Sequence, residues 1–475
     1  MSFRNSFRNM VVLCLCVIFS PSAWSTVFVQ WDHATLPPAS SLGVNEIVLA
    51  WGPGAPTALL ATARKQGYRV YVETPLDQAT SAAKACAKKS CAGIILKVPE
   101  SESAEIERSI ASFRSDYPKL RVLVLSPSGK RPKMRGSFII KRNSVLEVSS
   151  PTAQPWIDTN LALIKIEQRS RRPRTPLYTF SWADPGSQTA LTADDYSLAV
   201  AEAGAFHADL ILELDGHLQR GLNKHDGEAW ALWNQVRSTL KFSADTSAGA
   251  LEPAANVAVI VDQLDPHDEV ANLLSRHNIP FQVFTAADLK TEELKGFDIV
   301  IVFAKPDDEA VERIKNLATG GATVVAVDAH GKYSWQSSQP VQLNEHTTSY
   351  PAGNGKVLEL AEPVSDPETF VQDIRRLLGK QNALLSLWNG LTTIAVPYAV
   401  PQKDSGAKMN LLELVNYAGE PVRLQVQVKG SFTTVRYETP EGGCCGSLEL
   451  VRHDGFTEFV IPEIRIAGRV HLESK

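Results

Sequence analysis

Short runs of β-branched and aromatic residues alternate with helical stretches from residue 26 to about residue 245. Strands and helices that alternate in this way form parallel sheets, and eight strands are the number of a (β/α)8 barrel. We therefore predict a TIM-like barrel over 26–245. The predicted strands are 27–31, 46–51, 69–74, 92–98, 121–126, 145–150, 176–182 and 208–215. The predicted helices are 56–66, 77–88, 103–117, 159–168, 193–205 and 227–240.

Two connections of the predicted barrel depart from the regular pattern. The segment 32–45 is short and rich in proline, so it does not predict an ordinary helix. Between the fifth and sixth strands, 134–143 has the pattern of an extra hairpin arm that turns at Arg142 and Asn143. The barrel is therefore expected to be irregular at these two places.

Two further domains are predicted after a linker, 243–255, that is rich in Ala, Gly and Ser. Continuous apolar runs at 257–261, 281–284, 299–302 and 323–327 are typical of strands that are covered on both faces, and helices 266–277 and 307–319 separate them. We predict a flavodoxin-like α/β domain over 255–380. Alternating strands at 410–416, 422–429, 433–437 and 457–461, without helices, predict a β-sandwich over 384–475.

The N-terminus has the pattern of a signal peptide. Arg4 and Arg8 precede an apolar run, 10–19, and small residues lead to Ser25. The run is too short to span a bilayer, so we expect residues 1–25 to be removed and the protein to be secreted or periplasmic. The alternative is an uncleaved N-terminal membrane anchor. Without the two arginines the net charge is about −6, which argues against nucleic acid as a partner.

The chain has six cysteines. Cys14 and Cys16 leave with the predicted signal peptide, so Cys86, Cys91 and the adjacent pair 444–445 remain. An oxidising compartment favours a bridge between Cys86 and Cys91, whereas the adjacent pair forms either a strained ring or stays reduced. None of these spacings is that of a zinc site, and we predict neither a metal nor a cofactor.

The eighth predicted strand places carboxylates inside the barrel. Residues 208–215 read ADLILELD, so leucines alternate with Ile211, Glu213 and Asp215. The leucines should face the helices, and the carboxylates should point inward near the carboxyl end, where such barrels carry their sites. The same alternation puts Glu73 inside, next to Lys97. They form either a structural ion pair or, with Glu213 and Asp215, a cluster in which repulsion raises one pKa for use as a general acid.

Four tryptophans, Trp31, Trp51, Trp156 and Trp182, fall at or just beyond the carboxyl ends of predicted strands. Indole faces stack on the C–H faces of sugar rings, and nearby polar groups bind the hydroxyls. Gln154 is one such polar group, and His217, just past the last strand, is another. The alternative interpretation is that these tryptophans cap the packed core of the barrel.

The order of a barrel, a flavodoxin-like domain and a β-sandwich resembles the family-42-type β-galactosidases of the clan A glycoside hydrolases. This resemblance implies a barrel that acts on carbohydrate. It also implies a middle domain of the glutamine-amidotransferase fold that has lost its chemistry and makes oligomer contacts. No cysteine occurs between Cys91 and Cys444, so the middle domain lacks a thiol nucleophile.

The catalytic pair of that family is not visible at the expected positions. The resemblance implies glutamates at the ends of strands four and seven. Here strand four ends KVPE, which offers only Glu100 beyond a proline, and strand seven ends SWAD, which offers Asp184. The glutamate pair that the family uses is therefore not matched.

We predict a secreted, glycoside-hydrolase-like protein that acts on a carbohydrate at the carboxyl end of the barrel. A retaining mechanism needs two carboxyl groups about 5 Å apart. Glu213 or Asp215 would supply one, and Glu73 or Glu100 the other. The alternative is a catalytically inactive carbohydrate-binding or envelope scaffold protein. We expect no membrane contact after signal cleavage and a homo-oligomer through the middle domain.

Overall fold

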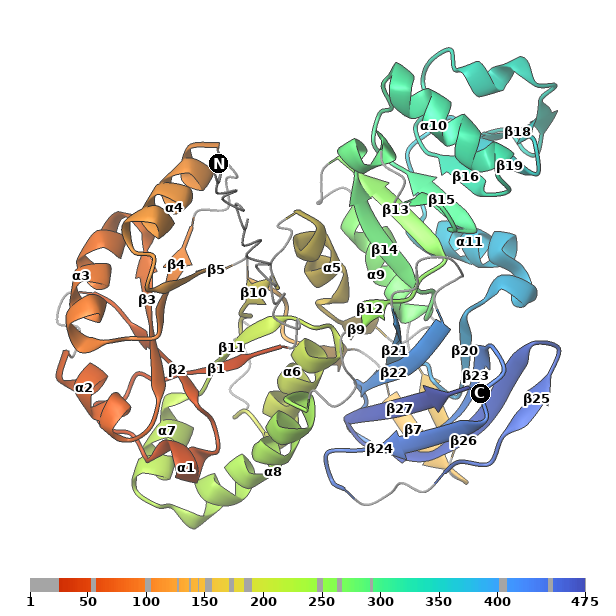
Figure 1. Cartoon of the computed structure of the whole chain (residues 1–475). Helices are drawn as coiled ribbons and strands as arrows, with labels where there is room; N and C mark the ends of the chain where they lie inside the picture. Colours follow the sequence, from red (N-terminus) through yellow and green to blue (C-terminus); the bar gives the residue numbers. More distant parts are fainter. Residues whose placement is uncertain are drawn as a thin grey trace, which may run out of the picture.

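The structure is a computed structural model that describes residues 25–474 except for short gaps. These gaps are 53–56, 99–103, 126–127, 136–137, 144, 150–155, 171–174, 183–189, 246–250, 263–266, 291–293, 401–407 and 443–446. Three bodies of secondary structure follow one another along the chain: a parallel barrel, an α/β sheet and a β-sandwich (Figure 1). The predicted fold class is confirmed.

Seven parallel strands, not the predicted eight, close the barrel, in the spatial order β1-β2-β3-β4-β5-β10-β11. These strands are β1 (Val27–Gln30), β2 (Glu46–Ala50), β3 (Arg69–Pro75), β4 (Gly93–Lys97), β5 (Arg121–Leu125), β10 (Leu177–Tyr178) and β11 (Asp209–Glu213). The helices of this region are α1 (Ala39–Leu42), α2 (Thr57–Lys65), η1 (Leu76–Gln78), α3 (Ala79–Lys89), α4 (Ala104–Asp116), α5 (Leu161–Ser170), α6 (Ala193–Ala205), α7 (Gly216–Asn223) and α8 (Gly227–Ser243).

The predicted sixth strand belongs to an arm instead. Its residues form β8 (Val145–Ser149), which pairs antiparallel with β7 (Phe138–Arg142). Asn143, at the predicted turn, has a left-handed φ of 50°. The base of the arm is closed by β6 (Lys133–Arg135) and β9 (Trp156–Asp158). Because β8 takes its hydrogen bonds from β7, the barrel closes directly between β5 and β10, at Leu125 and Leu177.

A small apolar cluster fills the barrel lumen, and it takes one residue from each strand. Its members are Phe28, Val48, Tyr71, Ile95, Leu125, Leu177 and Ile211. The central side chain is the fully buried Tyr71, whose ring meets that of Phe28 edge-on at 4.9 Å. Gly93 permits this, because a Cβ there would lie 2.8 Å from the Tyr71 ring. The lumen is therefore a packed core, and only the barrel's ends have room for polar groups.

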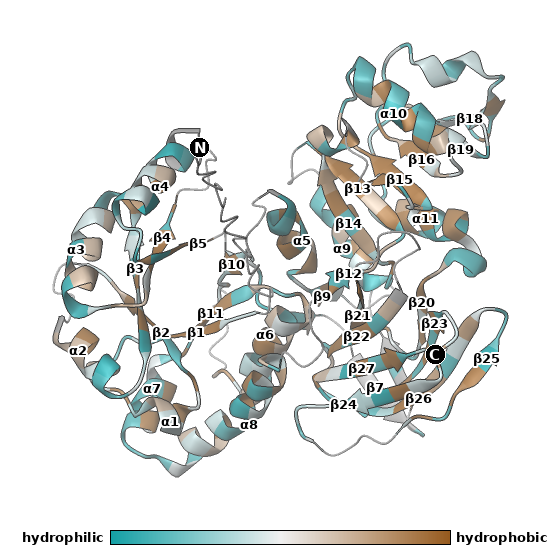
Figure 2. Ribbon diagram, viewed as in Figure 1, coloured by the Kyte–Doolittle hydropathy of each residue, from teal (hydrophilic) through white to brown (hydrophobic). Residues whose placement is uncertain are grey.

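The middle region is a doubly wound sheet in the order β14-β13-β15-β16-β19-β18-β17. Its strands are β13 (Val257–Val261), β14 (Phe281–Thr285), β15 (Ile299–Val302), β16 (Thr323–Ala326), β17 (Val341–Gln342), β18 (Thr347–Ala352) and β19 (Gly355–Leu360). The helices are α9 (Asp268–Arg276), η3 (Ala286–Lys290), α10 (Asp308–Thr319), η5 (Ser334–Ser337) and α11 (Pro367–Asn382). The strand β13, VAVIV, is hydrophobic and buried along its length, as expected of a strand covered on both faces, whereas the edge strand β14, FQVFT, includes the polar Gln282 (Figure 2).

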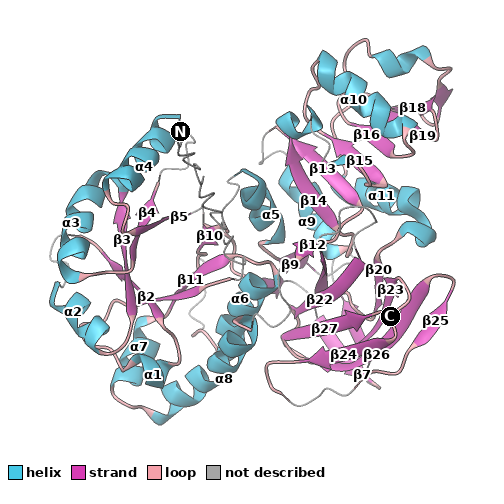
Figure 3. Cartoon of the chain, viewed as in Figure 1, coloured by secondary structure: helices cyan, strands magenta, loops and turns pink. Residues whose placement is uncertain are grey.

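The C-terminal region is a sandwich of two antiparallel sheets, and it contains no helix among its described residues (Figure 3). One sheet runs β12-β21-β22-β27-β24 and the other β20-β23-β26-β25. The strands are β12 (Glu252–Pro253), β20 (Leu385–Trp388), β21 (Thr393–Val400), β22 (Lys408–Asn416), β23 (Val422–Lys429), β24 (Thr434–Glu438), β25 (Val451–His453), β26 (Phe456–Ile464) and β27 (Ala467–Glu473).

The three regions are packed against one another. The core of the barrel continues into the sandwich, where Tyr398 stacks on His207 at 4.1 Å and its hydroxyl donates to the carbonyl of Ala205. The helix α5, which belongs to the barrel region by sequence, packs on β14, and its Ile166 lies in the same apolar cluster as Val283. These contacts bury apolar surface between the regions and hold them together.

Candidate functional site

The carboxyl end of the barrel brings Glu73 and Lys97 together. In the parallel pairing of β3 with β4, Pro75 lies opposite Lys97. Glu73 lies two residues before Pro75 on the same face of β3. The Lys97 ammonium forms an ion pair with Glu73 Oε1. The carboxylate is almost fully buried, whereas the lysine side chain is 56% exposed. The predicted structural ion pair is therefore present, and it neutralises one of the candidate catalytic carboxylates.

A groove of about 870 Å³ opens beside this pair. Lys97 lines it together with Asp77, Thr80, Ser109 and Asp116, which come from the helical segments after β3 and β4. The groove contains both apolar and polar side chains, as sites for small polar ligands do.

Glu213 faces the same end of the barrel from β11. It lies opposite Gln30 of β1 in the parallel register. Its Oε1 accepts a hydrogen bond of 3.1 Å from the hydroxyl of Thr179, and its side chain is half-buried. Because alternate residues of a strand face the same side, Glu213 shares the lumenal face with Ile211, as predicted. Unlike Glu73 and Asp215, Glu213 is engaged by a hydroxyl and not by an ammonium or a helix N-terminus.

Asp215 caps a helix. Its Oδ1 accepts hydrogen bonds from the backbone N–H groups of His217 and Leu218, both 2.8 Å long, at the start of α7. Its Oδ2 accepts a 2.8 Å hydrogen bond from the Tyr196 hydroxyl, which in turn accepts from the Asp215 N–H. Both carboxylate oxygens therefore hold the β11–α7 turn. A carboxylate in this position stabilises the start of the helix, and a catalytic role for Asp215 stays a prediction.

An aromatic cluster surrounds Trp182 near this end. The indole meets Phe180 edge-on at 4.8 Å and Tyr196 edge-on at 5.2 Å. The Arg131 guanidinium lies 5.9 Å from the ring centre and forms an ion pair with Asp195. Trp182 itself remains half-buried, so part of its surface meets solvent. The indole is therefore packed against two rings and has a charged margin, which suits a stacking platform.

The sequence pattern did not identify Arg131, Asp195 or Tyr196 as members of this site. Arg131 lies in the irregular segment after β5, where no periodicity marks an inward face. Asp195 is the third residue of α6 and closes a capping box with Thr192. Its spacing to Thr192 was a readable signal of a helix start, but only the folded chain places it beside Arg131.

Trp31 and Trp51 are held by the packing of the barrel. Trp31 is 1% exposed, and its indole N–H donates to the carbonyl of Thr35. Trp51 is partly buried against the same core, and its N–H donates to the Ser81 hydroxyl. The indole of Trp31 therefore belongs to the packed core, as in the alternative interpretation, and its role in substrate binding stays a prediction.

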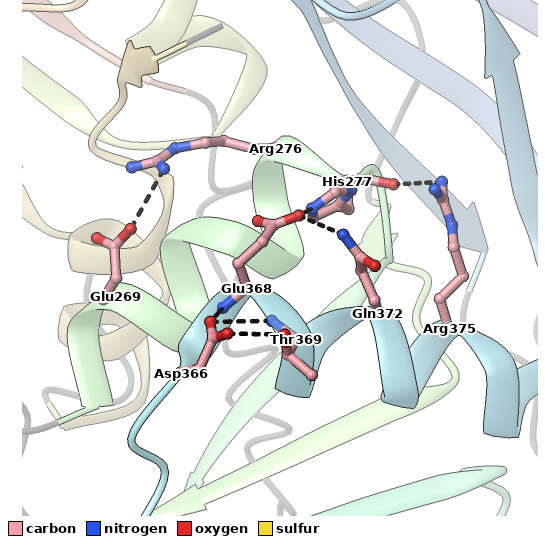
Figure 4. Close-up of polar contacts among 8 residues, drawn as sticks. All are labelled: Glu269, Arg276, His277, Asp366, Glu368, Thr369, Gln372 and Arg375. Carbon is pink, nitrogen blue, oxygen red and sulfur yellow. Dashed lines mark hydrogen bonds and ion pairs between the residues drawn. The ribbon is translucent and has the colours of Figure 1, made fainter. Parts of the chain in front are cut away.

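Trp156 lies at the junction between the barrel arm and the middle region. It is 37% exposed, but the guanidinium of Arg276 on α9 stacks on it at 4.0 Å. Figure 4 shows the polar cluster around Arg276, in which Glu269 binds the guanidinium at 3.2 Å and the neighbouring His277 bonds Glu368 of α11 at 2.8 Å. The cation–π contact therefore joins two regions, and a role of Trp156 in substrate binding stays a prediction.

The remaining candidates are placed as follows. His217 is an exposed residue in the first turn of α7. Glu100 and Gln154 lie outside the described residues. Within the described ranges, no group of three or more His, Cys, Asp or Glu side chains is arranged to hold a metal ion. Likewise, no helix in the described part of the chain is long and apolar enough to cross a membrane.

Cys86 and Cys91, for which a bridge was favoured, are free thiols in the structure, and both are buried. Cys91 follows the end of α3, and its N–H donates to the carbonyl of Cys86. A hydrogen bond from Cys86 lowers the pKa of the Cys91 thiol. The end of α3 holds the two thiols next to each other. An oxidant could therefore join them in a disulfide.

Charged residues also line the amino end of the barrel, opposite to the candidate site. Arg69 pairs with Glu46 at 2.9 Å, and Arg121 lies 3.7 Å from Asp209. Burial raises the pKa of Asp209 to about 6. At the junction with the sandwich, burial likewise raises the pKa of Glu202 to about 7. Both of these carboxyl groups lie away from the carboxyl end of the barrel.

Comparison with solved structures supports the fold. The chain resembles α-L-fucosidase isoenzyme 2 from Paenibacillus thiaminolyticus, with a TM-score of 0.57 and 12% identity over 95% of this chain and 100% of that one. It also matches Gan42B, a GH42 β-galactosidase from G. stearothermophilus (TM-score 0.45, 10% identity, 84% of this chain and 68% of that one). A rhamnosidase from Novosphingobium matches with a TM-score of 0.45 and 12% identity over 83% of this chain and 38% of that one.

No family model matches the sequence, and no curated protein matches it. The likeness to the fucosidase therefore concerns the fold alone. The chain has a glycoside-hydrolase-like fold, with a TIM-like barrel followed by further sheets.

Proposed function

We propose that this protein binds a carbohydrate at the carboxyl end of its barrel. In this proposal, Glu73 and Asp215 do not act as a catalytic pair that hydrolyses the carbohydrate. The observation that carries this proposal is the cluster around Trp182. It offers a half-buried indole that packs edge-on against two aromatic rings and is bordered by Arg131 and Asp195. Sugar recognition combines such an aromatic surface with charged hydrogen-bonding groups.

The state of the carboxylates favours binding over catalysis. A retaining glycosidase needs one carboxyl that can protonate the leaving oxygen and another that can attack the anomeric carbon. Glu73 is buried and its carboxylate is already held in an ion pair with Lys97. Both oxygens of Asp215 accept hydrogen bonds in the α7 cap.

Hydrolysis is the second candidate function, and Glu213 is the observation that favours it. Its carboxylate is half-buried at the mouth of the lumen and accepts a hydrogen bond from a neutral hydroxyl. Glu213 would act with Glu100, which follows β4 in the sequence. This candidate predicts turnover of an aryl glycoside, whereas the binding proposal does not.

The test is a panel of glycans and aryl glycosides, measured for both binding and turnover with the wild-type chain. Trp182→Ala should lower glycan affinity about fivefold or more, because an aromatic contact is worth about 1 kcal/mol or more. Trp388→Ala is the matched control, since Trp388 lies on the sandwich and is 45% exposed. Equal affinity in Trp182→Ala and wild type would refute the platform.

Turnover decides between the two candidates. If the wild type hydrolyses a glycoside and Glu213→Gln abolishes this while glycan binding persists, the protein is an enzyme and the binding proposal fails. If glycans bind without turnover in both chains, the binding proposal stands.

We further propose that the protein is exported after cleavage near Ser25. The support is the sequence pattern of Arg4, Arg8 and the apolar run 10–19. Mass spectrometry of the protein from the periplasm or the medium should give a mature chain that begins near residue 26. A membrane-bound chain of full length would contradict cleavage and support the anchor alternative.

A further inference from the structure

A second pocket lies in the flavodoxin-like sheet. It has a volume of about 290 Å³, and side chains that follow β13, β15 and β16 line it. The groups that bear on its chemistry are Asp262, Phe303, Lys305, Asp328, His330 and Tyr333. The volume is at the lower limit of about 300 Å³ for ligand pockets, so the occupant is no larger than a monosaccharide.

The pocket occupies the edge of the sheet where ligands bind in doubly wound folds. From β13 the chain passes to β14 on one side, and then returns to β15 on the other side of β13. The strand order therefore reverses next to β13, and a crevice forms outside the carboxyl ends of the strands at such a switch point. Asp262 directly follows β13, and Phe303 directly follows β15.

Asp328 is held in this pocket in an uncommon conformation. It follows β16 with a left-handed φ of 54°, which is rare for a residue other than glycine. The N–H of Val327 donates to the carbonyl of Val302 and that of Ala329 donates to the carbonyl of Leu360. The backbone on each side of Asp328 is thus fixed to the neighbouring strands, which holds its side chain at the pocket.

Two carboxylates and one lysine ammonium, that of Lys305, line the pocket, so carboxylates outnumber ammonium groups. Asp262 and Asp328 line it, and the Asp328 carboxylate lies 2.8 Å from His330 Nε2. Glu359 lies behind the wall, where it accepts hydrogen bonds from Trp335 and Gln336. Burial raises the pKa of Tyr333, and the negative charges of Glu359 and Asp328 raise it further. The Tyr333 hydroxyl therefore lies near negative charge.

The aromatic rings of the pocket are already stacked. His267 covers a face of Phe303 at 4.1 Å, and Trp335 covers a face of Tyr333 at 4.4 Å. On the Tyr333 ring, Gly331 also approaches so closely that a Cβ there would lie 2.9 Å from Tyr333 Cζ. One face of the Phe303 ring and one face of the Tyr333 ring are therefore already covered, and the carboxylates of Asp262 and Asp328 offer charged acceptors to a ligand.

We propose that this pocket binds a small molecule, of monosaccharide size or less, that carries an ammonium group. Asp328 and Asp262 accept hydrogen bonds from the ammonium, and Lys305 at the rim binds a hydroxyl or carboxylate of the same molecule. This site is independent of the carbohydrate site proposed for the barrel, because no residue is common to both.

The test uses the full chain and ligand-observed saturation-transfer NMR with glucosamine and ethanolamine as ammonium probes. Glucose and ethylene glycol are their neutral counterparts. At least one ammonium probe should bind about tenfold or more tightly than its neutral counterpart. Trp182→Ala, which alters only the barrel site, should leave this preference unchanged. If neither ammonium probe is preferred, or if the preference disappears in Trp182→Ala, the proposal is overturned.

Two substitutions at Asp328 distinguish a ligand-binding residue from a structural one. Asp328→Asn keeps the tolerance for left-handed φ but removes the charge, and Asp328→Gly relieves the backbone strain. Both should abolish the preference for the ammonium probe, and Asp328→Gly should unfold at the same or a higher temperature than wild type. Asp308→Asn removes an equivalent charge from the exposed start of α10 and should keep the preference.

Three results of these substitutions would overturn the proposal. They are an unchanged preference in both Asp328 variants, loss of the preference in Asp308→Asn, and a fall in the unfolding temperature of Asp328→Gly that accompanies the loss of binding. If Asp328→Asn does not fold, Asp262→Asn replaces it, and the same preference must be lost.

Discussion

The two ends of the barrel carry similar charged residues but use them differently. At the amino end, the Tyr71 hydroxyl accepts hydrogen bonds from both Arg69 and Arg121, and Asp209 accepts from the Thr26 N–H at 2.6 Å. At the carboxyl end, Glu73 pairs with an exposed lysine, and Glu213 contacts a hydroxyl. The amino end is a closed network, whereas the carboxyl end borders a groove.

This comparison teaches that a carboxylate inside a barrel is not by itself a sign of catalysis. Asp209 points inward, is buried and has a raised pKa, yet it lies at the end where barrels carry stability rather than chemistry. Position along the strand and an accessible cavity separate a site from a structural network. The following predictions test this separation, in order of decreasing effect on stability.

The largest effect is expected for Tyr71→Ala. The ring is fully buried in the lumen and packs on Phe28, so its removal should lower the free energy of unfolding by about 3–5 kcal/mol. Glycan affinity of the folded fraction should not change. Urea unfolding and binding measurements check this. Tyr71→Phe, which removes only the weakly bonded hydroxyl, should cost less than about 1.5 kcal/mol; equal costs for the two variants would contradict the packing role.

Asp209→Asn should change the dependence of stability on pH. Because burial raises the folded pKa to about 6, above the unfolded value, the stability that this carboxyl contributes is present below about pH 4. It is lost as the pH rises through 6. Between pH 4 and pH 7, wild type should therefore lose about 2–3 kcal/mol relative to the Asn variant. Urea unfolding at several pH values measures the difference, and parallel curves would show that Asp209 is not shifted.

Asp215→Ala should lower stability by about 1–2 kcal/mol, because it removes the α7 cap and leaves the Tyr196 hydroxyl without its acceptor. Asp226→Ala is a matched control, since Asp226 caps α8 through the same two kinds of backbone bond. It should cost about 1 kcal/mol. Thermal and urea unfolding of both variants test this. A stability of Asp215→Ala equal to wild type would return Asp215 to the list of available carboxylates.

Glu213→Gln should have the smallest effect on stability, within about 0.5 kcal/mol, since the amide oxygen can still accept from Thr179. Its effect should instead fall on glycan binding or turnover at the barrel mouth. Unfolding and binding are measured on the same preparation. Suppose instead that Glu213→Gln loses as much stability as Asp215→Ala and glycan binding does not change. Glu213 would then have a structural role, as the charged residues at the amino end do.

Local patterns predicted the strands well, including the inward direction of Glu213 and the pairing of Glu73 with Lys97. In both cases the alternation of side chains along a strand predicts which residues face the lumen. The parallel register of neighbouring strands then determines how far along the barrel axis each side chain lies. The pattern failed for 145–150, which has the composition of a buried strand but pairs with its own hairpin partner. The composition of a segment predicts that it is extended. It does not predict which neighbouring strand will form hydrogen bonds with its backbone.

The candidate site was less predictable because its members come from distant segments. Trp31 and Trp156 each follow or form a strand, as Trp182 does, but one is buried in the core and another stacks on Arg276 of a different region. Asp215 ends an inward-facing pattern, yet the turn into α7 redirects its carboxylate to backbone N–H groups. Sequence position alone does not distinguish these environments.

The amino-acid sequence by itself determined the order of the barrel, the doubly wound sheet and the sandwich, because hydrophobic periodicity is a local property of each segment. It also determined which strand faces are apolar. Only the tertiary structure decided that seven strands close the barrel, that α5 packs on the middle sheet, and which carboxylates are neutralised or capped. The physical reason is that hydrogen-bond partners, burial and cavities depend on contacts between residues far apart in the chain.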